Sequence, residues 1–267
     1  MPEAPLSTGE ASLTRQVHGH LLLMGLNRPR KKNAFDLGML NALAAAVTEL
    51  DASTELRCGV IFAHGADFTA GLDLMSVAPQ LSAGQHLFGD DVIDPWGTHG
   101  RPCSKPIVIA VRGLCLTLGI ELLLNCEVCV AGTDTRFAQI EVRRGLFPFG
   151  GGTARWISRV GWGTAMRWLL TGDELGAAEA HRIGLVQEIV PPDQALPRAI
   201  ELAERIAAQA PLGVAATLRS SRLSVDQGEA AAMRELLPEL RALMKSEDAR
   251  EGLSSFIERR AGVFRGR

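Results

Sequence analysis

The sequence predicts an α/β fold that ends in a helical region. Short β-rich segments alternate with helical patterns as far as Pro191-Pro192, and only helical patterns follow, from Ala195 to Arg259. The order strand, helix, strand is typical of right-handed crossovers in an α/β core. We therefore expect an α/β core over residues 1–192 and a helical C-terminal region over residues 193–267.

The core prediction depends on five strands and one clear helix. The apolar runs Cys58–Gly65 and Pro106–Gly113 are nearly continuous, as in a sheet that is covered on both faces. Leu37–Leu50 carries its apolar residues on one side and predicts an amphipathic helix. The weakly patterned segment Ser76–Ser104 predicts a mobile excursion over the core, of a kind that often covers a site. The remaining predicted strands are His20–Asn27, Glu127–Gly132 and Leu185–Val190.

The composition restricts the class of protein. Of the 267 residues, 46% are hydrophobic, which favours a large buried core over disorder. The net charge of −2 gives no overall attraction to nucleic acid or to an anionic membrane. The N-terminus lacks a basic stretch followed by an apolar one, and no apolar run approaches membrane-spanning length. We expect a soluble, cytoplasmic protein that binds neither nucleic acid nor membrane.

Several common chemistries find no support. The chain has no G-x-S-x-G motif and no Walker A loop, and the glycine run at 150–152 lacks the spacing of a dinucleotide fingerprint. His18 and His20 have no third ligand in view, so we expect no metal site. Five scattered cysteines argue against a disulfide framework. We expect Cys126 and Cys129, despite their C-x-x-C spacing, to be inert buried thiols.

Glu121 stands in the apolar stretch TLGIELLLNC, where an unpartnered charge is expensive to bury. A helix beginning near Thr117–Gly119 would place Glu121 in its first turn, where the helix dipole favours a negative charge. A capping box does not account for it, because that motif needs the carboxylate at position 120. From the residues alone, a structural charge and a catalytic carboxylate both remain open.

A second carboxylate, Glu141, follows Glu121 by twenty residues and precedes Arg143-Arg144. One interpretation is an ion pair between Glu141 and one of these arginines. The other is chemical, because two carboxylates that meet in a fold can divide the roles of general acid and general base. The residues alone leave this choice open as well.

Two tight turns lead into predicted helices. After one strand, Ala70-Gly71 turns the chain into a helix-like segment that starts at Leu72; after another, a helix begins near Thr117–Gly119. The first N–H groups of a helix are unpaired and can bind anions. If both helix starts converge, they form an oxyanion hole. The alternative for the first turn is an ordinary connection, with Asp73 as a first-turn charge.

Five segments, in this order, resemble motifs of the crotonase (enoyl-CoA hydratase/isomerase) superfamily. The resemblance covers nearly the whole chain and implies a crotonase-like spiral of repeated ββα units with a helical C-terminal oligomerisation region. It also implies a homotrimer or homohexamer. The segments are LNRPRKKNAF (Leu26–Phe35), FTAGLDL (Phe68–Leu74), VRGLCLTLGIELLLNCE (Val111–Glu127), FAQIEVRRGLFPFGGGT (Phe137–Thr153) and TGDELGAAEAHRIGLVQEIV (Thr171–Val190).

The resemblance implies an enoyl-CoA hydratase, which adds water across the C2=C3 bond of a 2-enoyl-CoA thioester. By match, Glu121 helps to activate the water and Glu141 delivers a proton to C2. The backbone N–H groups of Leu72 and Leu118 match the two donors of the oxyanion hole. Coenzyme A is part of the substrate, so no separate cofactor is implied.

The resemblance also implies residues that bind CoA. The basic stretch RPRKK is either a generic solvated patch or, by match, a partner of the CoA phosphates. Near the C-terminus, SSFIERR is similar to a terminal helix that reaches CoA from a neighbouring subunit. The matched residues are Arg30, Lys31, Lys32, Ala34, Ala70, Leu72, Asp73, Leu74, Phe256 and Arg259.

Three positions depart from the family pattern. Leu118 stands in place of a glycine, Ile140 in place of a proline and Phe149 in place of a small residue. Leu118 and Phe149 are expected to narrow the acyl pocket. Two alternatives follow: an enoyl-CoA isomerase, which needs chiefly the glutamate that Glu141 matches, and a non-catalytic protein that binds acyl-CoA.

Overall fold

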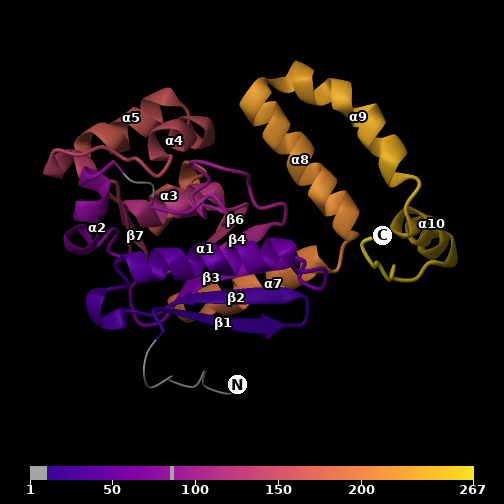
Figure 1. Ribbon diagram of the computed structural model, residues 1–267, viewed down its shortest axis with the longest axis horizontal. Helices are drawn as coiled ribbons and strands as arrows, with labels where there is room; N and C mark the ends of the chain where they lie inside the picture. The colour runs from indigo at the N-terminus through magenta and orange to yellow at the C-terminus, as the bar shows by residue number, and fades with distance from the viewer. Residues whose placement is uncertain (1–10, 85–86) are drawn as a thin grey trace.

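The computed structural model describes residues 11–84 and 87–267, and its core is a six-stranded sheet (Figure 1). β1 and β2 pair antiparallel, and every later pair of neighbours is parallel. All five predicted strands are confirmed, each shorter than expected. In spatial order the strands are β1 Leu13–His18, β2 Leu21–Leu26, β3 Cys58–Ala63, β4 Ile107–Val111, β6 Val128–Gly132 and β9 Glu188–Val190.

A smaller sheet lies beyond the ends of the core strands. It consists of β5 (Leu114–Leu116), β7 (Arg136–Ala138) and β8 (Glu174–Gly176), and a bridge from Thr69 to Cys115 joins the stretch after β3 to it. Each of β3, β4 and β6 therefore passes through a short extended stretch before the next helix. This repeat confirms the expected fold class of ββα units.

Helices cover both faces of the main sheet. Alternate side chains of each strand point to opposite faces, so Ile61 packs in the cluster of α1 (Leu37–Ala52) and Val60 in that of α7 (Ala195–Ala207). The sequence explains why α7 can approach closely, because its buried residues are alanines at every fourth position. They are Ala195, Ala199, Ala203 and Ala207.

Short helices surround the end of the sheet at which β3, β4 and β6 finish (Figure 1). Among them, α3 is buried almost throughout, from Leu118 to Leu124, so it packs inside the core rather than over it. These helices are α2 Leu74–Ser82, α3 Leu118–Asn125, α4 Gly152–Val160, α5 Trp162–Thr171 and α6 Ala177–Arg182, with the short 3₁₀ helices η1 Pro29–Lys31, η2 Glu141–Arg144 and η3 Pro192–Gln194.

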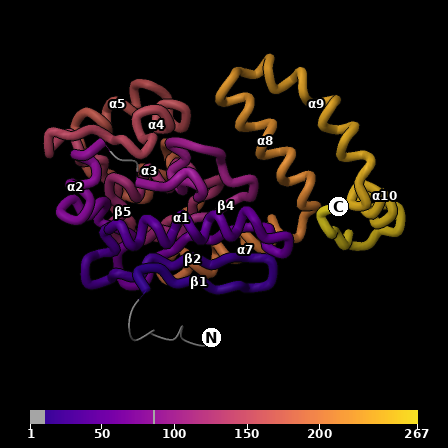
Figure 2. Tube along the Cα trace, in the orientation of Figure 1, coloured from indigo at the N-terminus to yellow at the C-terminus, as the bar shows by residue number. Residues whose placement is uncertain are grey.

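The C-terminal helices leave the core. α8 (Pro211–Gln227) and α9 (Glu229–Leu243) form a hairpin beside the core, and α10 (Glu247–Glu258) follows α9 near the open end of this hairpin (Figure 2). The helical content after residue 192 is as predicted, although the division into two regions at that residue stays a prediction. α9 and α10 expose apolar side chains, including Met233, Leu236, Leu237, Leu240, Leu253, Phe256 and Ile257.

Two local predictions need correction. The helix after the Ala70-Gly71 turn begins at Leu74 rather than Leu72, because Phe35 pairs with the chain on both sides of Leu72. The predicted excursion Ser76–Ser104 is helical as far as Ser82; Gln85 and His86 lie outside the described residues, as do residues 1–10 of the N-terminus.

The predicted burial of the C-x-x-C cysteines is confirmed: Cys126 is 5% and Cys129 is 1% exposed. Burial raises the pKa of both thiols, which keeps them protonated and unreactive. Within the described part of the chain, no helix combines the length and apolar character needed to cross a membrane.

Candidate active site

The four residues predicted to take part in catalysis line one cavity of about 140 Å³: Leu72, Leu118, Glu121 and Glu141. Leu72 follows β3, the segment of Leu118 and Glu121 follows β4 and β5, and Glu141 follows β6 and β7. Neighbouring parallel strands end at the same edge of a sheet, so residues far apart in sequence meet there. The fold thus brings the two matched carboxylates and the two matched backbone positions together.

The N–H of Leu118 is an unused donor because of the turn before α3. Thr117 has φ 47° and ψ −114°, a conformation that suits glycine and strains a β-branched residue. Its own N–H donates to the carbonyl of Ala138 (3.0 Å), and its carbonyl accepts the N–H groups of Ile120 (2.8 Å) and Glu121 (3.2 Å). No acceptor in the described structure receives the N–H of Leu118.

The N–H of Leu72 is left unused in a similar way. Phe35 donates its N–H to Gly71 (2.8 Å) and accepts that of Asp73 (2.9 Å), which bypasses Leu72. Among the described residues the N–H of Leu72 has no acceptor. Gly71 has φ +93°, and a methyl group there would lie 1.9 Å from Thr117 Oγ1. Only glycine therefore lets the two turns touch.

Glu121 is buried, with 1% of its surface exposed. Oε1 accepts the N–H of Gly152 at 2.8 Å, and Oε2 has no hydrogen-bond partner in the described structure. Burial raises the pKa of Glu121 from 4.5 to about 7; the Gly152 hydrogen bond opposes this rise and the charge of Glu141 adds to it. Beyond its place in the helix dipole, Glu121 is a carboxyl group able to exchange a proton near neutral pH.

Glu141 is the first residue of η2 and is 8% exposed. Gln139 donates its side-chain N–H to Glu141 Oε1 at 2.8 Å, and the indole N–H of Trp156 donates to Gln139 Oε1 at 3.3 Å. This chain fixes the amide so that its donor faces the carboxylate. Oε2 of Glu141 has no hydrogen-bond partner among the described residues, and burial raises the pKa of this carboxyl group.

The ion-pair interpretation of Glu141 is not supported. Arg143 binds Asp173 at 2.9 Å, and within the described structure no ion pair joins Glu141 to Arg143 or Arg144. Arg144 contributes to the wall of the cavity instead. The carboxylate is therefore not neutralised by its sequence neighbours.

The residues matched to CoA binding fall into two groups. Ala70, Leu72 and Leu74 line the cavity. The carbonyl of Lys32 accepts the N–H of Ala70 at 2.8 Å, which connects the basic segment to the first turn.

The basic residues Arg30, Lys31 and Lys32 are exposed near this edge, and Ala34 follows them. Asp73, also matched to CoA binding, pairs with Arg28 at 3.3 Å.

Phe256 and Arg259 are not brought to the cavity by their own chain. Phe256 lies on α10 and is 82% exposed, and Arg259 directly follows that helix. Figure 1 shows α10 at the right edge of the molecule, away from α3 in the core. Their assignment to CoA from a neighbouring subunit stays a prediction.

Several residues at the site were not predicted. Gln139 and Trp156 orient Glu141, and the indole N–H of Trp96 donates to the carbonyl of Leu118 at 2.8 Å. Arg155 donates to the carbonyls of Gly150 (3.3 Å) and Gly97 (3.0 Å), which holds the loop that precedes the Gly152 N–H. The glycine run at 150–152 was a visible signal, whereas nothing local marks the others.

The glycine run has a steric cause. A methyl group at Gly152 would lie 2.8 Å from Glu121 Oε1, and one at Gly150 would lie 3.0 Å from Oε2. Both distances are shorter than ordinary contacts, so the backbone can approach the carboxylate only as glycine. Within the described chain, no group of three or more His, Cys, Asp or Glu side chains is arranged to hold a metal ion.

Comparison with known proteins decides the family. The profile of the enoyl-CoA hydratase/isomerase family matches residues 16–267. The chain belongs to this family. Its members act on acyl-CoA thioesters. An enoyl-CoA hydratase of Mycobacterium tuberculosis is 34% identical, with 99% of this chain and 100% of that protein covered. A 2,3-dehydroadipyl-CoA hydratase of Escherichia coli is 34% identical, covering 92% and 96%.

Solved structures support the same assignment. The crystal structure of a probable enoyl-CoA hydratase/isomerase from Mycobacterium abscessus is 50% identical to this chain, with a TM-score of 0.94 and coverage of 96% and 99%. The crystal structure of an enoyl-CoA hydratase from Mycobacterium tuberculosis is 35% identical, with a TM-score of 0.88. The resemblance seen in the sequence motifs is thereby confirmed at the level of the enoyl-CoA hydratase/isomerase family and its fold.

The raised pKa of Glu121 predicts a pH dependence of stability. Glu121 binds its proton more tightly in the folded state (pKa about 7) than at its ordinary value of 4.5. The contribution of this proton to the free energy of unfolding is therefore present in full below pH 4.5 and is lost as the pH rises through about 7. The loss amounts to about 3 kcal/mol, at about 1.4 kcal/mol for each pH unit between the two pKa values.

Glu121→Gln removes this titration while its side-chain oxygen can still accept the Gly152 N–H. Relative to the wild type, the variant should gain unfolding free energy between pH 4.5 and pH 8, as measured by urea denaturation at a series of pH values. Parallel pH profiles for the two proteins would contradict the burial of an ionisable Glu121.

Proposed function

We propose that this member of the family is an enoyl-CoA hydratase. The observation that carries the proposal is that one cavity is lined by two buried carboxyl groups and by Leu72 and Leu118. Among the described residues, each carboxyl group has one oxygen without a hydrogen-bond partner, and neither backbone N–H has an acceptor. An isomerase requires chiefly one acid–base group, so a second carboxyl group with an available oxygen favours hydration.

In the proposed reaction the thioester oxygen accepts hydrogen bonds from the N–H groups of Leu72 and Leu118. Negative charge gathers on that oxygen as water attacks C3, and donors fixed in a water-poor site stabilise it strongly. Glu121, ionised above a pH of about 7, accepts a proton from the water. Glu141 gives a proton to C2, and burial favours the protonated form that this step needs.

The atoms balance in this scheme. The hydroxyl group of water forms a bond to C3, the pair of electrons from the double bond passes through the enolate to C2, and C2 receives the proton of Glu141. Glu121 ends protonated and Glu141 ionised, so one proton must pass from the first carboxyl group to the second before the next turnover. No separate cofactor enters, because CoA belongs to the substrate.

The exposed basic segment Arg30–Lys32 is proposed to pair with the phosphates of CoA. Its attachment to the Ala70 turn through the Lys32 carbonyl (2.8 Å) fixes it beside the thioester end of the cavity. Charge-assisted hydrogen bonds to phosphate are among the stronger polar contacts in proteins. Product identification after incubation with a panel of enoyl-CoAs separates a hydratase from an isomerase, and binding without turnover would identify an acyl-CoA binding protein.

Glu121→Gln and Glu141→Gln should each lower the turnover of crotonyl-CoA by at least about 100-fold, because each removes a positioned acid–base group. Loss of absorbance of the conjugated thioester measures the rate. CoA affinity and thermal unfolding, measured on the same samples, establish that the variants remain folded. Near wild-type turnover in either folded variant would refute the mechanism with two glutamates.

Substitutions at Leu118 should separate the role of its backbone N–H from the role of its side chain. Leu118→Ala keeps the N–H and should keep the reaction type, with a changed acyl preference. Leu118→Pro deletes the donor and should lower turnover roughly 100- to 1,000-fold.

Proline also restricts the backbone conformation of Thr117, the residue before it. The matched control is therefore an ester in place of the Leu118 amide, which deletes the N–H and keeps the leucine side chain. The assignment fails if Leu118→Ala is inactive while the proline and ester variants, folded and able to bind CoA, turn over normally.

We further propose a homotrimer, or a homohexamer formed from two trimers, assembled through α9 and α10. Their exposed apolar side chains need burial against another surface. Sedimentation at micromolar concentration should give a mass of three or six chains. Leu237→Glu, which places a charge on an exposed apolar position of α9, should dissociate the assembly, and a monomeric wild type would overturn the proposal.

A further inference from the structure

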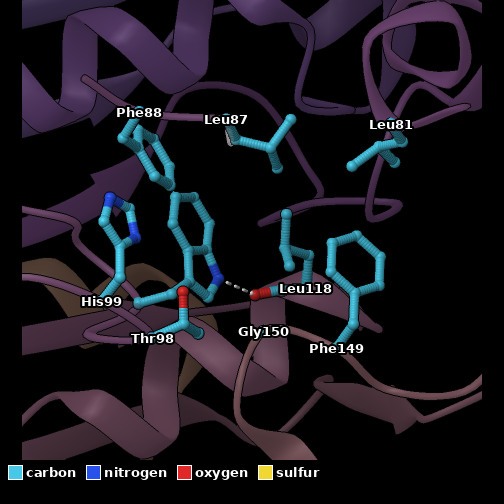
Figure 3. A pocket seen from close by; sticks show the side chains of 9 residues that line it. Leu81, Leu87, Phe88, Thr98, His99, Leu118, Phe149 and Gly150 are labelled. Atoms are coloured by element: carbon cyan, nitrogen blue, oxygen red, sulfur yellow. Dashed lines mark hydrogen bonds between the residues drawn. The ribbon is translucent and has the colours of Figure 1, made fainter. Parts of the chain in front are cut away.

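A second cavity, of about 200 Å³, shares lining residues with the proposed catalytic cavity. Figure 3 shows the side chains that line it. The side chains of Leu118 and Phe149 line both, so they stand between the two spaces. The cavity is mostly apolar, with Leu81, Leu87 and Phe88 in its wall.

This distal cavity comes close to the proposed reacting groups. A methyl group at Gly150, which lines the distal cavity, would lie 2.7 Å from Leu118 Cδ1, 3.0 Å from Glu121 Oε2 and 3.1 Å from Trp96 Cδ1. The side chain of Leu118, the unpartnered oxygen of Glu121 and the indole therefore meet at this glycine. A substituent on C3 of a thioester held beside Glu121 would therefore face the distal cavity across the side chains of Leu118 and Phe149.

The wall of the distal cavity is a fixed aromatic surface. The rings of Phe88 and Trp96 stack with centroids 5.8 Å apart, and those of Phe88 and His99 with centroids 6.0 Å apart. Phe35 packs edge-on against Trp96 at 5.2 Å, and the indole N–H binds the Leu118 carbonyl at 2.8 Å. Rings held from several sides cannot rotate away to lengthen the cavity.

Thr98 and the Nδ1 of His99, both in the wall, are directed at one buried carboxylate. Thr98 donates both its N–H (2.7 Å) and its hydroxyl (2.6 Å) to Asp94 Oδ2, and His99 Nδ1 lies 3.3 Å from the same oxygen. The hydroxyl proton of Thr98 and the Nδ1 of His99 already face Asp94. An apolar ligand that enters the cavity therefore does not have to displace water from these two groups. The distal cavity is suited to hydrocarbon.

On the assumption that the proposed hydratase function is correct, we propose that the preferred substrates are 2-enoyl thioesters that carry a compact six-membered ring on C3. An apolar cavity of about 150 Å³ is known to hold benzene, so one of about 200 Å³ accommodates a ring. Flat aromatic walls make extensive contact with a ring. A straight chain of nine carbons beyond C3 exceeds this space.

Three CoA thioesters test the proposal: 3-cyclohexyl-2-propenoyl, crotonyl and 2-dodecenoyl. The saturated cyclohexyl ring avoids conjugation with the double bond, which would alter its reactivity. For the wild type, kcat/KM should be at least about 10-fold higher for the cyclohexyl substrate than for either of the others, since filling an apolar pocket with even one methylene is worth roughly 10-fold or more. Equal or better use of 2-dodecenoyl-CoA would overturn the proposal.

Leu81→Phe, on α2, adds bulk to the distal cavity and provides the structural test. It should lower kcat/KM for the cyclohexyl substrate at least about 10-fold and change that for crotonyl-CoA less than about 3-fold, because crotonyl carries only a methyl group on C3. The matched control is Leu170→Phe, the same substitution at a helical position that is 68% exposed and lines neither cavity. An equal loss for both substrates would overturn the assignment of the cavity.

Failure of the hydratase proposal gives a different result. If the wild type hydrates none of the three thioesters, calorimetry with the unreactive 3-cyclohexylpropanoyl-CoA still tests the cavity. Binding at least about 10-fold tighter than butanoyl-CoA, and lost in Leu81→Phe but not in Leu170→Phe, supports the ring site without turnover. Equal affinities in all proteins refute it.

Discussion

The hydrogen bond from the Gly152 N–H to the buried carboxyl group of Glu121 is the constraint on which the site depends. A carboxyl group that is 1% exposed needs a polar partner, and here a single backbone donor satisfies one oxygen and leaves the other available. The partner must be glycine, because a methyl group would lie 2.8 Å from Oε1. Arg155 holds the same loop by two carbonyls and places a positive charge near Glu121.

A second constraint is the contact between the two turns that leave β3 and β5. Thr117 has a positive φ that is costly for a β-branched residue, and the surrounding hydrogen bonds with Ala138, Ile120 and Glu121 hold it there. As a result, the N–H groups of Leu118 and Leu72, two residues that line the same cavity, both lack an acceptor among the described residues. The backbone strain at Thr117, the contact between Gly71 and Thr117 and the two N–H groups without an acceptor in the described structure therefore belong to the same pair of turns.

Trp96 contacts residues of both cavities. Its indole N–H binds the carbonyl of Leu118, the residue whose N–H is the proposed oxyanion donor, while its ring forms part of the distal wall. Leu118 therefore has its backbone carbonyl bound by the same residue that forms part of the wall of the distal cavity. The departure from glycine at position 118 is compatible with this arrangement, since the side chain serves only as a partition.

The sequence by itself determined five of the six strands of the main sheet, the amphipathic helix over Leu37–Leu50 and the ordered motifs that indicate the family, because these are carried by local periodicity and by residues close together in the chain. It left open whether Glu121 and Glu141 were structural, and it gave no sign of Gln139, Trp156 or Trp96 as supports. Only the tertiary structure showed that both carboxyl groups line one cavity and which residues support them. Gly152 meets Glu121 across 31 residues and Trp96 meets Leu118 across 22, and no local pattern records which distant groups the parallel strands bring to one edge.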